Sequence, residues 1–84
     1  MSEIDYSKLR SLTARKFLQA LKSDDFILDR VKGSHHHFIN LDGRRVTIPF
    51  SKPSDTFGVT LLKYIIESQA HWTEADLKRL KLVK

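Results

Sequence analysis

The stretch that decides the fold is FILDRVKGSHHHFINLDGRRVTIP, residues 26–49. It contains three segments rich in β-branched and aromatic residues, which predict strands over residues 26–31, 35–41 and 44–48. Turn-forming residues separate them: Lys32-Gly33-Ser34 follows the first, and Asn40-Leu41-Asp42-Gly43 carries the Asp-Gly signal of a hairpin. Pro49 ends the third segment, because it has no backbone N–H to donate. Three strands with short turns indicate an antiparallel meander.

A helical pattern precedes the meander. Apolar residues recur there at the spacing i, i+3, i+4 and i+7 of an amphipathic helix, namely Ala14, Phe17, Leu18 and Leu21. Ser11 or Thr13 can cap this helix at its start, and Ser23-Asp24-Asp25 ends it by competing for backbone hydrogen bonds.

Two further helices are predicted after the meander. A polar loop over residues 50–58 leads into an apolar helical segment, residues 59–69. A short last helix begins at Thr73, an N-cap followed by acidic residues, and has Leu77 and Leu80 on its apolar side. We therefore predict an α+β fold of order α-β-β-β-α plus a short C-terminal helix. Its helices cover one face of a three-stranded antiparallel sheet and leave the other face open.

The length of 84 residues suits one domain with a modest core. We predict an N-terminal arm over residues 1–12 and a single domain over residues 13–84. The arm is polar and is expected to be loose, although Tyr6, Leu9 and Leu12 could pack on the body.

The composition excludes several classes of protein. There is no cysteine, which rules out disulfides, thiolate zinc sites and cysteine nucleophiles and fits a reducing compartment. No apolar run approaches the roughly 20 residues of a membrane span, and the N-terminus lacks a signal-peptide core. We expect a cytoplasmic protein without a membrane partner, and the lack of glycine-rich phosphate loops excludes nucleotide-binding folds.

Positive charge is concentrated around the meander. The chain has a net charge of +5, and residues 26–52 hold five basic side chains against two acidic ones. Such a patch attracts the phosphates of RNA without reading sequence, and it would equally serve as a solvated surface. The candidate RNA contacts are Arg30, Lys32, Arg44, Arg45 and Lys52.

Strand alternation divides the three consecutive histidines. If Phe38 points into the core, His36 shares its side, and His35 and His37 point to the open face. The open face would then also gather Arg45, Thr47 and, as a further candidate, Lys32. A register slip of one residue would put His36 in place of His35.

These residues suit the cleavage of RNA without a metal ion or cofactor. A histidine can remove the proton of a ribose 2′-hydroxyl or protonate the leaving 5′-oxygen, and basic side chains can stabilise the charged transition state. The Gly33-Ser34 turn can offer backbone N–H groups to phosphate. The run of three histidines has three other interpretations: it could be the remnant of an expression tag, His35 and His37 could bind zinc, or the histidines could only pack and form hydrogen bonds.

The order of helix, strand, Lys-Gly-Ser-His, strand, Asp-Gly-Arg-Arg-Val-Thr-Ile-Pro and helix resembles the HicA (YcfA-like) toxins of toxin–antitoxin systems. The resemblance covers roughly residues 13–80. It implies a fold like that of double-stranded-RNA-binding domains, a ribonuclease that cleaves mRNA, and a HicB-like antitoxin that covers the site. It assigns the catalytic role to His35, with His36, His37, Ser34 and Gly33 as possible supporting residues.

The chain also departs from the family pattern. Asp25 stands where members often have glycine, Ser51 stands where many have a histidine, and the entry to the second long helix is one residue longer. If the missing histidine assists chemistry, activity here would be weaker. A non-catalytic RNA-binding module of the same fold and a protein-interaction domain therefore remain alternatives.

Overall fold

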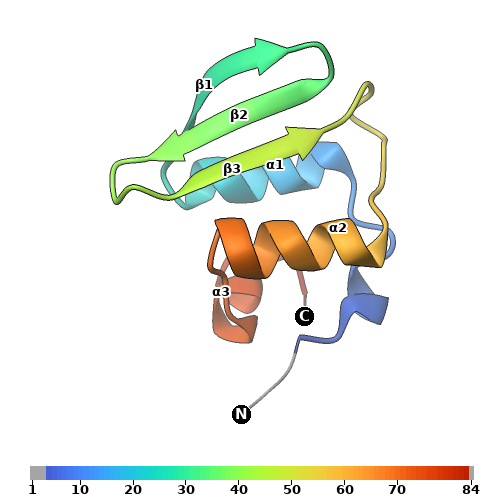
Figure 1. Cartoon of the computed structure of the whole chain (residues 1–84). Coiled ribbons are helices and arrows are strands. Elements are labelled where there is room, and N and C mark those ends of the chain that lie inside the picture. Colours follow the sequence, from blue (N-terminus) through green and yellow to red (C-terminus); the bar gives the residue numbers. More distant parts are fainter. Residues whose placement is uncertain (1–3, 84) are drawn as a thin grey trace.

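Three antiparallel strands form one sheet in the order β1-β2-β3, as the meander predicted (Figure 1). In the computed structural model, which describes residues 4–83, the strands are β1 Phe26–Lys32, β2 His35–Asn40 and β3 Arg45–Pro49. Their ends differ from the predicted ones by one residue. Lys32 extends β1 by one residue. Arg44 lies in the turn before β3, because its carbonyl accepts a backbone hydrogen bond of 3.0 Å from the Asn40 N–H and so closes the turn.

The two turns use glycine where the backbone needs a positive φ. Gly33 has φ +61° at the first position of the two-residue β1–β2 turn, as a type II′ hairpin requires. Gly43 has φ +96° and ends the three-residue β2–β3 loop. Asp25 has φ +66° just before β1, a left-handed conformation that glycine adopts freely and Asp adopts more readily than most other residues.

All the helices lie on one side of the sheet (Figure 1). They are the 3₁₀ turn η1 Tyr6–Leu9, then α1 Ala14–Ser23, α2 Val59–Lys63 continued by the π-helical segment η2 Tyr64–Gln69, and α3 Glu74–Arg79. Thr13 caps α1, and a capping box of Thr73 and Asp76 starts α3. The predicted α+β arrangement is therefore confirmed. No helix in residues 4–83 is both long enough and apolar enough to cross a membrane.

The core fills the layer between helices and sheet. Phe17 of α1 is at its centre, stacked on Trp72 at 5.7 Å and edge-on to Phe57 at 5.9 Å between ring centroids. From the sheet, Val46 and Ile48 of β3 are fully covered. Burying such side chains contributes about 1.5–3 kcal/mol each.

The segment before α1 is packed over its described part, which corrects the expectation of a loose arm. Leu9 and Leu12 are buried in the core, 1% and 5% exposed. The Tyr6 hydroxyl donates a hydrogen bond to Glu67 of η2, and burial together with this carboxylate raises the pKa of Tyr6. Residues 1–3 and Lys84 lie outside the described residues, and the boundary between arm and domain stays a prediction.

Candidate nucleic-acid interface and histidine site

Strand register sorts the histidines between the two faces of the sheet. His36 pairs with Ile48 and Phe38 pairs with Val46, so both lie on the helix-covered side with these core residues. His35 pairs with Pro49 and His37 pairs with Thr47 on the opposite side. The predicted register is therefore correct, and His35 and His37 share the open face.

A β-bulge brings two cations to the same face. The register of β1 against β2 shifts between Leu28 and Arg30, after which Arg30 pairs with His37 and Lys32 with His35. Simple alternation from Leu28 would have put Arg30 on the covered side. The extra residue, Asp29, thus redirects Arg30 and Lys32 to the histidines, as bulges commonly do at functional sites.

The remaining predicted cations divide between two places. Arg45 pairs with Ile39 and is exposed on the open face. Lys52 is exposed in the loop after β3, where its backbone N–H donates to Asp55. Arg44 does not join them: its side chain is 22% exposed and its guanidinium pairs with Asp24 and Asp42. These ion pairs hold Arg44 in the fold, and its contact with RNA stays a prediction.

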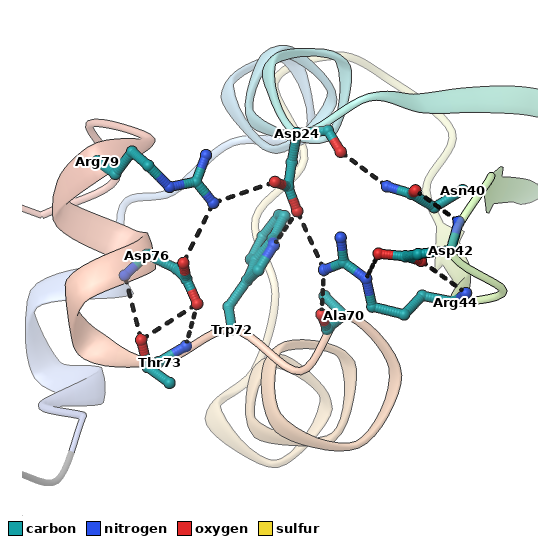
Figure 2. Close-up of polar contacts among 9 residues, drawn as sticks. All are labelled: Asp24, Asn40, Asp42, Arg44, Ala70, Trp72, Thr73, Asp76 and Arg79. Carbon is teal, nitrogen blue, oxygen red and sulfur yellow. Dashed lines mark hydrogen bonds and ion pairs between the residues drawn. The ribbon is translucent and has the colours of Figure 1, made fainter.

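Figure 2 shows where Arg44 is held. The Asp24 carboxylate, only 13% exposed, accepts hydrogen bonds from Trp72 Nε1 at 2.8 Å and Arg79 Nη2 at 3.0 Å, and pairs with Arg44 Nη1 at 3.0 Å. Burial acts to raise the pKa of Asp24, but the hydrogen bonds from Trp72 and Arg79 and the charge of Arg44 outweigh it and hold the pKa below its usual value. Arg44 also donates to the carbonyl of Ala70.

His36 is held at the β1–β2 turn. Its Nδ1 lies 3.0 Å from the carbonyl oxygen of Ser34, and its ring stacks on Phe50 with centroids 3.8 Å apart. The same carbonyl accepts the N–H of Phe50, so Gly33-Ser34 is fastened to the end of β3. Because a carbonyl can only accept, this contact fixes the proton of His36 on Nδ1.

His37 has a different partner. Its Nδ1 lies 3.0 Å from Thr47 Oγ1, and the Thr47 N–H donates to Gln69 Oε1 at 2.9 Å. Neither Thr47 nor Gln69 was singled out from the sequence. The β-branched residue at 47 was predicted on the open face, but only the packing of η2 against β3 reveals Gln69.

His35 is the exposed member of the group, and within residues 4–83 its ring makes no hydrogen bond to another side chain or to the backbone. It lies beside Lys32 at the turn. Across the same range, no three side chains of His, Asp or Glu gather closely enough to hold a metal ion. The open face thus combines two imidazoles with three cations, Arg30, Lys32 and Arg45.

The chain was compared with known proteins. The family model described as "HicA toxin of bacterial toxin-antitoxin" matches residues 14–72, from the start of α1 to Trp72. This span contains the whole sheet, both turns and η2. Among curated proteins, none matches the chain.

Proposed function

Since the chain belongs to the HicA toxin family, we propose that it is the RNA-cleaving toxin of a toxin–antitoxin pair, an endoribonuclease that cuts mRNA. The observation that carries the proposal is the gathering of His35 and His37 with Arg30, Lys32 and Arg45 on a sheet face that no helix covers. Cations attract the RNA backbone and imidazoles can transfer protons at neutral pH.

His35 is the residue proposed for proton transfer. In such a reaction a base removes the 2′-hydroxyl proton, O2′ bonds to phosphorus, and the P–O5′ bond breaks as the leaving oxygen is protonated. The products are a 2′,3′-cyclic phosphate and a 5′-hydroxyl end. We propose that Lys32, which pairs with His35 across the hairpin, stabilises the additional negative charge on phosphorus. The sequence of steps requires no metal ion or cofactor.

The test is cleavage of end-labelled mRNA in excess EDTA by the parent protein, by H35A and by H71N as a matched control. His71 is exposed and has φ +56°, a conformation that Asn tolerates, and it lies at the corner between η2 and α3. We expect H35A to lose activity by about 100-fold or more while H71N retains it. Cleavage by H35A at the parent rate would contradict the role of His35, and cleavage that stops in EDTA would contradict a metal-independent reaction.

RNA binding without cleavage is the competing function. One observation favours it: the His35 ring has no orienting hydrogen bond within residues 4–83. A binder would hold RNA with a strong dependence on salt and leave it intact in the same assay.

The family also implies an antitoxin partner. We propose a HicB-like protein in the cytoplasm that covers the open face and so competes with RNA for the same cations. Its addition should release bound RNA and stop cleavage. An antitoxin that binds the toxin and RNA together would contradict a shared surface.

A further inference from the structure

The contact between His37 and Thr47 distinguishes this histidine from its two neighbours. Thr47 lies directly opposite His37 in the β2–β3 register, and both side chains are half-buried. The 3.0 Å distance between Nδ1 and Oγ1 therefore rests on strand pairing and not on a chance rotamer of two free side chains. The contact occupies Nδ1 and leaves Nε2 as the ring nitrogen available to a substrate.

Gln69 fixes the position of Thr47. β3 is an edge strand, and the N–H of Thr47 finds its acceptor in the Gln69 side chain instead of in a further strand. Gln69 is the last residue of η2, whose widened turns include an i to i−5 hydrogen bond from Ala70 N–H to Ile65 O of 2.8 Å. π-helical segments are uncommon and occur often at functional sites.

A hydroxyl is a suitable partner for a ring that must change its protonation state. When Nδ1–H donates to the Thr47 hydroxyl oxygen, the same contact persists in the neutral ring and in the imidazolium, and Nε2 is the nitrogen that gains and loses the proton. His36 can keep its contact with the Ser34 carbonyl in the same way, but it lies on the helix-covered side with its ring stacked on Phe50, whereas His37 shares the open face with His35. His37 can therefore gain and lose a proton at Nε2 without losing its contact.

We propose that His37 is the second proton-transfer residue of the site, and that Thr47 and Gln69 are positioning residues that hold its ring. The inference rests on the proposed ribonuclease function. His35 and His37 are alternate residues of one strand, about 7 Å apart on the same face, so a phosphodiester across β2 could contact both. One ring removes the 2′-hydroxyl proton as O2′ attacks phosphorus, and the other protonates the departing 5′-oxygen.

The charged surroundings of His37 come from two strands. Opposite it at the bulge are Asp29 and Arg30 of β1, and diagonal to it are Lys32 of β1 and Arg45 of β3. Three of these four groups are cations, which favour a bound phosphate beside the ring. From η2, the uncharged Gln69 accepts the Thr47 N–H.

The test measures the rate of RNA cleavage against pH for the parent, H35A, H37Q and two variants of Thr47. The parent should give a bell-shaped profile from two histidines. H37Q should lose about 100-fold in kcat and one limb of the bell, and the limb that disappears tells whether His37 acts as acid or base. T47V, which keeps the branched shape without the hydroxyl, should lose about tenfold in kcat and shift that same limb, whereas T47S should stay within about threefold of the parent.

Gln69 provides an independent pair of variants. Q69L removes the acceptor for the Thr47 N–H and should lower kcat with little change in KM. Q69E keeps an acceptor but adds a negative charge near the bound phosphate, so it should retain more of kcat than Q69L and raise KM. Unfolding midpoints check that each variant is folded. A purely structural role for Gln69 would lower the midpoint of Q69L and leave the pH profile unchanged.

Binding is measured separately with an RNA that carries a 2′-deoxy sugar at the cleaved position. H37Q should bind it within about threefold of the parent, and a loss of affinity that accounts for the whole loss of rate would overturn the proton-transfer role. H37Q that cleaves at the parent rate with both limbs intact would also overturn it, while an inactive H35A in the same assay would leave the proposed function standing. A parent protein that cleaves no RNA would instead refute the proposed function, and the role of His37 with it.

Discussion

Two groups of charged side chains lie on opposite sides of the sheet, and they are built differently. Among the helices, the Asp24 cluster of Asp24, Arg44, Trp72 and Arg79 pairs each charge with a partner within about 3 Å (Figure 2). On the open face, Arg30, Lys32 and Arg45 stand beside two histidines, and within residues 4–83 no carboxylate pairs with these three cations.

The difference separates a group that supports the fold from the group that we propose contacts RNA. Asp24 follows α1, Arg44 precedes β3, Trp72 follows η2 and Arg79 ends α3, so one carboxylate connects four parts of the chain. Removing Asp24 leaves the buried Trp72 N–H without its acceptor and takes one ion pair each from Arg44 and Arg79, which lowers stability. The cations of the open face have no such internal role, and their unneutralised charge is available to phosphate.

The largest effect on stability is expected for D24A. The variant removes the acceptor of the Trp72 N–H and one ion-pair partner of Arg44, which keeps Asp42 and the Ala70 carbonyl, so we expect the free energy of unfolding to fall by about 3 kcal/mol, measured by denaturant titration.

The neighbouring carboxylate provides a control for D24A. Asp25 is exposed and has φ +66°, which Asn tolerates, so D25N should change stability by less than about 0.5 kcal/mol. Equal losses in D24A and D25N would show that the Asp24 cluster is not what holds these four parts together.

Two adjacent arginines separate the two groups more sharply. Arg44 lies 4.9 Å over the Phe26 ring and pairs with Asp24, so R44A should cost about 2 kcal/mol of stability and leave RNA affinity per folded molecule unchanged. R45A should do the reverse: stability within about 0.5 kcal/mol, and a slope of log affinity against log salt reduced by about 1.

The measurements are unfolding titrations and RNA binding at several salt concentrations. If R44A lowers the salt slope as much as R45A does, Arg44 contacts RNA despite its ion pairs, and the division between the two groups fails.

The sequence predicts much of this arrangement and misses specific parts of it. Period-two alternation and the glycines at Gly33 and Gly43 are local signals, and they place His35 and His37 on one face correctly. Arg44 and Arg45 are adjacent residues of the same type, so the sequence does not tell them apart. The three-residue β2–β3 loop directs the Arg44 side chain toward Asp24.

The other differences come from contacts distant in sequence. Nothing local marks the bulge at Asp29, which depends on how β1 pairs with β2. The contact of Gln69 with Thr47 spans 22 residues and forms only after η2 has packed on the edge of the sheet. Leu9 and Leu12 look like isolated apolar residues in a polar segment, yet the core formed by later elements buries them.

The smallest effect concerns acid. Hydrogen bonds and neighbouring charges hold the pKa of Asp24 below its usual value, despite the opposing effect of burial. A carboxyl whose pKa is lower in the folded than in the unfolded state stabilises the fold at neutral pH, and this contribution is lost as pH falls from about 4 through the folded-state pKa. D24N cannot titrate there, so the difference in unfolding free energy between parent and D24N should shrink as the solution is acidified below about pH 4.

Asp55 and Asp76 also have lowered pKa values but are present in both proteins, so their contributions cancel in this difference. A difference between parent and D24N that stays constant down to pH 2 would mean that the Asp24 charge does not stabilise the cluster, and the contrast between the two groups would then rest on packing alone.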